Sequence, residues 1–134
     1  MYDTPLEENE DLDFEISFYE GLISKKPDFI EALQALGDAY TKKGLYEKGL
    51  SIDEHLSQLQ PKDPYVLYNL ACSYSLLNQT DKALRSIKLA IKMGYRNFDY
   101  LMEDKDLDNL RKDSRFRRYF SRIEKRINES NSKA

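Results

Sequence analysis

Apolar residues recur along the chain at the spacing of one helical face. One stripe is formed by Leu33, Leu36 and Tyr40, and a stripe with the same spacing begins at Leu67, 34 residues later. Positions i, i+3, i+4 and i+7 share a face of a 3.6-residue helix, so each stripe predicts an amphipathic helix. Over the whole chain the pattern predicts helices near 12–24, 29–43, 46–59, 64–77, 80–93 and 114–128, with short turns around 98–110.

The two stripes belong to an internal repeat. Residues 30–63 align with residues 64–97 at a spacing of 34. The aligned pairs are Leu33 with Leu67, Leu36 with Leu70, Gly37 with Ala71, Tyr40 with Tyr74, Gly49 with Ala83 and Leu50 with Leu84. Small residues in two of these pairs allow neighbouring helices to approach closely. The repeat therefore predicts two helical hairpins of the same design.

Residues that begin and end helices lie close to the predicted boundaries. Three side chains can cap a helix N-terminus: Asp28, with Glu31 three residues later; Asp63, which precedes Pro64; and Thr80. Three residues that accept positive φ can end a helix: Gly44, Asn78 and Gly94.

These residues resemble the tetratricopeptide repeat, in which small and aromatic positions recur at fixed offsets. The first unit supplies Leu36, Gly37, Tyr40, Gly49 and Pro61, and the second supplies Leu70, Ala71, Tyr74, Ala83, Ile87 and Ala90. The chain departs from the pattern at Asp53, Leu56 and Tyr95. The resemblance implies an all-α fold: a right-handed superhelical stack of antiparallel helix hairpins (an α-solenoid) with a C-terminal capping helix.

The same resemblance suggests a division of the chain into one domain with two short ends. We expect an acidic flexible N-terminus at 1–11, a helical domain at 12–128 and a disordered tail at 129–134. Within the domain we expect a half repeat at 12–29, repeats at 30–63 and 64–97, and a degenerate closing unit at 98–128.

The net charge of −3 conceals a gradient along the 134 residues. Residues 1–20 hold eight acids and no base, residues 21–104 balance, and residues 105–134 carry a net charge of +5. Such asymmetry can steer partners, or one copy of the chain towards another. Residues 1–15 are acidic where an export signal is basic and then apolar, so we predict a cytoplasmic location.

The composition offers little for catalysis. The chain has one cysteine, Cys72, and one histidine, His55, which excludes an intrachain disulfide, a cysteine zinc site and an HExxH motif. Gly-rich phosphate-binding loops are absent from the sequence. We interpret His55 as a solvated surface residue, with a catalytic role as the alternative. We interpret Cys72 as a small half-buried residue of the inner face, with a ligand-contacting or reactive thiol as the alternative. We therefore predict a protein that is not an enzyme and has no cofactor, metal or small-molecule substrate.

The basic C-terminal segment allows two interpretations. Phe116, Tyr119, Phe120 and Ile123 share one helical stripe, and the many Arg and Lys residues occupy the other faces. This arrangement predicts a capping helix packed on the last repeat. Cations among aromatic residues also suit nucleic acid or an anionic membrane surface, which we rank below the cap because the whole chain is acidic.

A concave groove follows from the resemblance, since the first helix of each unit lines the inner side of such a stack. The residues expected there are Glu31, Gln34, Asp38, Thr41, Lys42, Tyr65, Tyr68, Asn69, Cys72, Asp99 and Glu103. Related arrays hold acidic C-terminal peptides with a clamp of Lys, Arg and Asn. Only Asn69 keeps a clamp residue at the matching offsets, and acids replace two of the bases, so like charge argues against an acidic ligand.

The sequence therefore predicts a non-catalytic protein-interaction module that binds a basic or aromatic peptide segment of a partner. One alternative is a self-associating subunit whose acidic head meets a neighbour's basic tail. Another is nucleic-acid binding through the basic C-terminal helix.

Overall fold

The computed structural model describes the backbone of residues 6–133 and the side chains of residues 8–132. Along the described residues the chain forms helices and no strand. The elements are α1 (Leu6–Lys25), α2 (Ile30–Lys43), α3 (Tyr46–Leu59), α4 (Pro64–Leu76), α5 (Thr80–Lys92), α6 (Phe98–Glu103), the 3-10 turn η1 (Lys105–Leu107), α7 (Asp108–Arg111) and α8 (Ser114–Lys133). The predicted helices are confirmed, but the turns predicted around 98–110 are wrong, because that segment forms α6, η1 and α7. The fold is the expected all-α stack of antiparallel hairpins.

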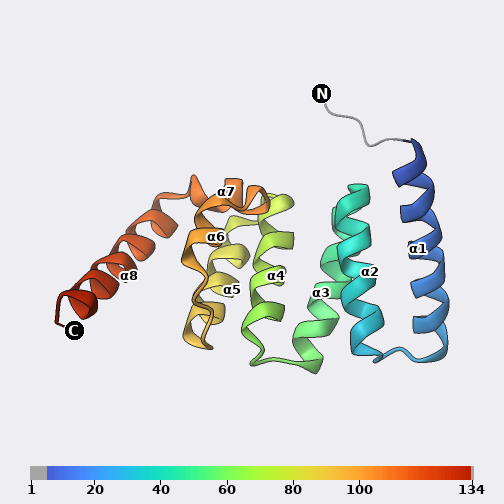
Figure 1. The fold of residues 1–134 in the computed structure, drawn as a ribbon, viewed down its shortest axis with the longest axis horizontal. Helices are drawn as coiled ribbons and strands as arrows, with labels where there is room; N and C mark the ends of the chain where they lie inside the picture. Colours follow the sequence, from blue (N-terminus) through green and yellow to red (C-terminus); the bar gives the residue numbers. More distant parts are fainter. Residues whose placement is uncertain (1–5, 134) are drawn as a thin grey trace.

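Helices α1 to α5 stack side by side in chain order, α7 lies across the ends of α4 and α5, and α8 lies at the opposite end of the stack from α1 (Figure 1). Small residues allow α2 and α3 to approach closely. A Cβ atom at Gly37 would lie 3.2 Å from Oδ1 of Asp53, and one at Gly49 would lie 3.1 Å from Oγ1 of Thr41. The glycines of the first unit therefore act as contact points between the two helices of a hairpin.

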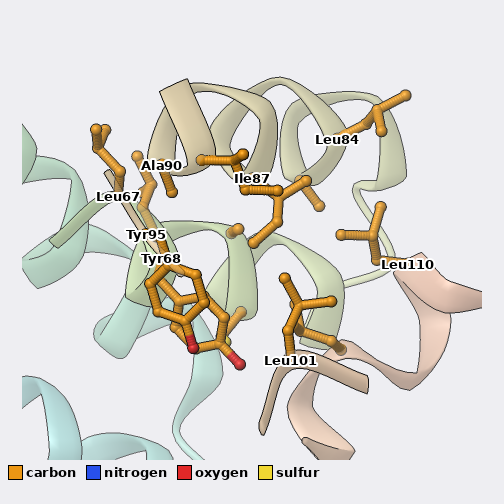
Figure 2. Close-up of a cluster of buried hydrophobic side chains, with 14 of the residues drawn as sticks. Leu67, Tyr68, Leu84, Ile87, Ala90, Tyr95, Leu101 and Leu110 are labelled. Carbon is orange, nitrogen blue, oxygen red and sulfur yellow. The ribbon is translucent and has the colours of Figure 1, made fainter. Parts of the chain in front are cut away.

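The main hydrophobic core lies between α4, α5 and the segment that follows them (Figure 2). Ile87 and Ala90 of α5 are fully buried there, together with Leu101 and Leu110 of the closing segment. A smaller cluster of Leu33, Leu56 and Val66 joins α2, α3 and α4. Each helical pair thus buries its apolar face only by stacking on its neighbours, as expected of a repeat array.

Residues 98–120 close the stack. Leu110 N–H donates to Oγ of Ser75 (3.1 Å), and the side chain of Asn109 donates to the backbone carbonyl of Ser75 (2.9 Å). Phe116 and Phe120 of α8 are buried in the main core, and the Phe120 ring meets that of Phe98 edge to face at 5.8 Å. The apolar stripe of α8 therefore packs as the predicted cap.

Two of the three predicted N-caps are wrong. Phe29, not Asp28, precedes α2, and Asp28 instead bonds Nε2 of His55 at 3.0 Å. α5 starts at Thr80 itself, after Gln79, without a side-chain cap. Asp63 caps α4 as predicted by accepting from the N–H groups of residues 65 and 66. The three helix-ending residues all have positive φ: Gly44 (84°), Asn78 (61°) and Gly94 (119°).

The predicted ends of the domain are wrong where the structure describes them. Residues 6–11 belong to α1 and residues 129–133 to α8, whereas we expected a flexible head and a disordered tail. Acids in the first turns of a helix interact favourably with its dipole, which explains why the acidic segment continues α1. Residues 1–5 and 134 lie outside the described residues, and the division into repeat units stays a prediction.

Candidate binding groove

A cavity of about 540 Å³ lies between α2, α4 and the segment that follows α5. Helices α2 and α4 form most of its wall, and α3 contributes Asp53. The segment from Tyr95 to Asp106 forms the far wall. The lining residues are Gly37, Asp38, Thr41, Lys42, Asp53, Tyr65, Tyr68, Asn69, Cys72, Ser73, Leu76, Tyr95, Asn97, Tyr100, Asp104 and Asp106. We refer to this cavity as the tyrosine groove.

Four tyrosines give the groove its shape. The rings of Tyr68 and Tyr95 stack in parallel with centroids 4.4 Å apart, and both residues are buried. Tyr65 meets the Tyr95 ring edge to face at 5.9 Å and is 68% exposed. The ring centroid of Tyr100 lies 6.1 Å from that of Tyr68, and Tyr100 is 52% exposed. The buried tyrosines, Tyr68 and Tyr95, therefore support the exposed ones, Tyr65 and Tyr100. Figure 2 shows the buried pair.

Asp104 organises the floor of the groove. Its Oδ2 accepts a 2.7 Å hydrogen bond from the hydroxyl of Tyr68 and a 3.7 Å contact from the thiol of Cys72, and its Oδ1 accepts from Asp106 N–H at 3.0 Å. Burial, with help from this carboxylate, raises the pKa of the Cys72 thiol well above its usual range. Burial likewise raises the pKa of Tyr95 to about 12. The Cys72 thiol and the Tyr95 hydroxyl therefore stay protonated and neutral near neutral pH.

A second carboxylate is buried beneath α2. Asp53 accepts a hydrogen bond of 2.5 Å from the hydroxyl of Ser73. Burial raises the Asp53 pKa to about 6; the Ser73 hydrogen bond opposes this shift, and the charge of Asp38 adds to it. Burial also raises the pKa of Asp38, against the opposing effect of Lys42.

The groove is acidic overall. Its lining includes four aspartates, Asp38, Asp53, Asp104 and Asp106, and one lysine, Lys42. Burial raises the pKa of Asp106, and like-charge repulsion from the neighbouring Asp104 adds to this shift. A cationic ligand group relieves such repulsion, whereas an acidic one adds to it.

The structure brings most of the predicted groove residues together. Seven line the cavity: Asp38, Thr41, Lys42, Tyr65, Tyr68, Asn69 and Cys72. Glu31, Gln34, Asp99 and Glu103 are exposed and are not part of its lining. Tyr68 and Cys72 are buried, so they support the groove and offer little free surface.

The repeat pattern did not predict the far wall, including Tyr95, Tyr100, Asp104 and Asp106. The 34-residue register fails after Leu101, so an offset carried over from the repeats pointed to Asp99 and Glu103. Two signals were visible in the sequence: Tyr95 stands where the repeat pattern has proline, and Asp53 stands where it has an aromatic residue.

The class of protein follows from this fold together with a sequence match. A family profile described as tetratricopeptide repeat matches residues 54–85, which run from α3 through α4 into α5. Residues 54–85 therefore match a tetratricopeptide repeat, as the residue pattern predicted. Such arrays serve typically as non-catalytic interaction scaffolds.

Individual relatives match larger parts of the chain. A protein of Arabidopsis thaliana that is described as chloroplastic is 37% identical over 95 residues. The match covers 69% of this chain but 27% of the relative, so the chain spans about a quarter of that protein's length. Because the relative is described as chloroplastic, the cytoplasmic location stays a prediction.

Two solved structures share the fold. "MamA RS-1 ArsTM double mutant" has a TM-score of 0.71 and 19% identity, with 95% of this chain and 72% of that chain covered. "MamA 41-end from Desulfovibrio magneticus RS-1" has a TM-score of 0.67 and 16% identity, with 90% and 68% covered. Identities this low show a common architecture alone.

Two kinds of feature are absent from the described residues. Within them, no helix is long and apolar enough to cross a membrane. In the same part of the chain, no group of three or more His, Cys, Asp or Glu side chains is arranged to hold a metal ion.

Proposed function

We propose that the protein is a non-catalytic interaction scaffold whose tyrosine groove binds an extended segment of another protein. The ligand segment carries a lysine or arginine next to a bulky apolar residue. One observation supports this most directly: exposed tyrosine rings lie beside carboxylates in a cavity of about 540 Å³. Cavities of this size are typical of binding sites.

The exposed tyrosines suit the side chains of such a segment. Tyr65 is held by its edge-to-face contact with Tyr95, and Tyr100 lies against Tyr68. Rigid tyrosines offer large apolar area at a low entropic cost, and their faces attract cations by about 0.5–2 kcal/mol. Asp104 and Asp106 supply the opposite charge within the same cavity.

The backbone of the segment also has a partner. The exposed side chain of Asn69 lines the groove from α4. An amide donates and accepts hydrogen bonds, so it can bind the backbone of an extended peptide whatever its side chains. We expect micromolar affinity, roughly −8 kcal/mol, because the stacked helices need little ordering.

Peptide titration tests this proposal. Two peptides of equal length, one alternating Arg with Tyr and one alternating Glu with Tyr, are titrated by calorimetry. The basic peptide is expected to bind and to lose at least about tenfold in affinity with Tyr65→Ala or Tyr100→Ala. Tyr46→Ala is the matched control, because Tyr46 is exposed on α3 and does not line the groove.

Two outcomes contradict the proposal. Preferential binding of an acidic C-terminal peptide, lost on Asn69→Ala, restores the clamp interpretation. Equal loss of affinity in the Tyr46→Ala control places the binding site outside the groove.

A further inference from the structure

The outer face of α1 carries two exposed aromatic side chains. Phe14 is 72% exposed and Phe18 is 53% exposed, and their rings stack with centroids 6.4 Å apart. They lie one helical turn apart and therefore share a face. Glu10 and Asp11, one turn earlier, are exposed on that side of the helix. We refer to these four residues as the head patch, an apolar pair within an acidic surface.

The opposite end of the stack has a groove of complementary character. A cavity of about 420 Å³ lies between α5 and α8. Its lining residues are Ile91, Lys92, Arg96, Phe98, Tyr119, Ile123, Arg126 and Ile127. Lys92, Arg96 and Arg126 are exposed and positively charged, and the other five residues are apolar or aromatic. We refer to this cavity as the tail groove.

The cations of the tail groove are set around an apolar floor. Arg96 is held in place because its Nη1 donates to the carbonyls of Ile91 (2.8 Å) and Tyr95 (2.9 Å). Tyr119 and Ile123 are only half-buried against the main core, so their free surface faces the cavity. The tail groove can therefore bind a surface whose aromatic rings contact its apolar floor and whose acidic residues pair with its cations.

We propose that the head patch of one copy docks in the tail groove of a second copy, so that the chains associate head to tail. Charge complementarity selects this occupant: the head patch pairs two phenylalanines with two acids, and the tail groove pairs an apolar floor with three cations. Two head patches facing each other would bring like charges together. The two surfaces lie at opposite ends of the stack (Figure 1), so a chain cannot join its own head to its own tail.

The geometry also determines the kind of assembly. A contact between different surfaces of identical subunits is heterologous and leaves one head and one tail free at every stage. Two phenylalanine rings bury roughly 150–250 Å² each, less than the ~800 Å² per partner of a standard interface. The association is therefore expected to be weak and to add further copies as concentration rises.

Mixing of two disabled variants provides the test. The head variant carries Phe14→Ser and Phe18→Ser, and the tail variant carries Lys92→Glu and Arg126→Glu. All four positions are exposed, so folding is expected to persist, and circular dichroism melting checks it. Sedimentation analysis over roughly 5–500 µM, at low and high salt, measures the mass.

The expected result has three parts. The unaltered chain gains mass with concentration and loses this gain at high salt. Each variant alone stays a monomer. An equimolar mixture forms a one-to-one dimer that grows no further, because only one intact head and one intact tail remain to pair.

Controls and contrary outcomes are equally specific. The charge control Lys62→Glu with Lys105→Glu makes the same charge change at exposed positions outside the tail groove, and Tyr65→Ser removes an exposed aromatic residue of the tyrosine groove. Both are expected to associate as the unaltered chain does. A chain that stays monomeric throughout, a tail variant that dimerises alone, or a charge control that abolishes association overturns the proposal. None of these outcomes depends on peptide binding in the tyrosine groove.

Discussion

The hydroxyl of Ser73 on α4 donates a hydrogen bond of 2.5 Å to Asp53 on α3, and this bond connects one repeat to the next. The carboxylate is buried, and burial raises its pKa from 3.8 to about 6. An acid with a raised pKa in the folded state stabilises the fold when protonated, and that stabilisation is lost as pH rises through about 6.

Asp53→Asn is therefore expected to stabilise the protein at pH 7.5 by roughly 1–3 kcal/mol. The neutral amide keeps an oxygen for Ser73 and removes the buried charge. Melting temperatures at pH 4.5 and 7.5 measure the effect, and the variant's advantage should shrink at the lower pH. Asp99→Asn, at an exposed position, is the control. An advantage that is equal at both pH values contradicts the assigned cause.

Gly37 and Gly21 are expected to respond in opposite directions when a side chain is added. A Cβ at Gly37 would lie 3.2 Å from Asp53 and 3.3 Å from Ile52, whereas nothing lies within 4 Å of a Cβ at Gly21. Gly37→Leu should cost about 1–3 kcal/mol by overpacking. Gly21→Ala should add about 0.5–1 kcal/mol, because alanine favours helix interiors. Urea unfolding measures both, and an unchanged midpoint for Gly37→Leu would count against the close packing of α2 on α3.

The closing helix is expected to contribute strongly to stability. Phe116 is fully buried in the main core, so Phe116→Ala should cost about 3–5 kcal/mol. Phe14→Ala removes the same ring from an exposed site and should leave the melting temperature almost unchanged. Thermal unfolding of dilute samples compares the two. A melting temperature that Phe116→Ala leaves unchanged would show that α8 does not act as a cap.

Cys72 is expected to be inert in the folded protein. Its thiol is buried beside Asp104, and its pKa lies well above the usual range, so little thiolate forms. A colorimetric thiol reagent at pH 8 should react slowly with the native chain and rapidly in urea. Rapid reaction of the native chain would reveal a more exposed thiol.

The repeat pattern predicted the helices because each one buries a regular stripe. Leu33, Leu67 and their partners specify which face packs, and only stacked helices satisfy that pattern. Helix starts were less predictable, because Asp28 could either cap α2 or bond His55 and the sequence does not rank the two.

The sequence pattern predicted groove residues on the wall formed by α2 and α4. It missed those on the wall formed by the closing segment. Asp38, Tyr65 and Asn69 follow the helical offset, so they line the groove. Tyr100 and Asp104 belong to a segment with its own local structure. Their positions depend on how that segment docks onto α4, which no spacing rule specifies.

The hydrogen bond from Tyr68 to Asp104 joins residues 36 positions apart and crosses from α4 to the closing segment. One wall of the tyrosine groove thus consists of the segment that also seals the hydrophobic core. A ligand in contact with both walls would connect α4 to the closing segment and hold the two together. A ligand bound in the groove as proposed would therefore also stabilise the C-terminal end of the array against unfolding.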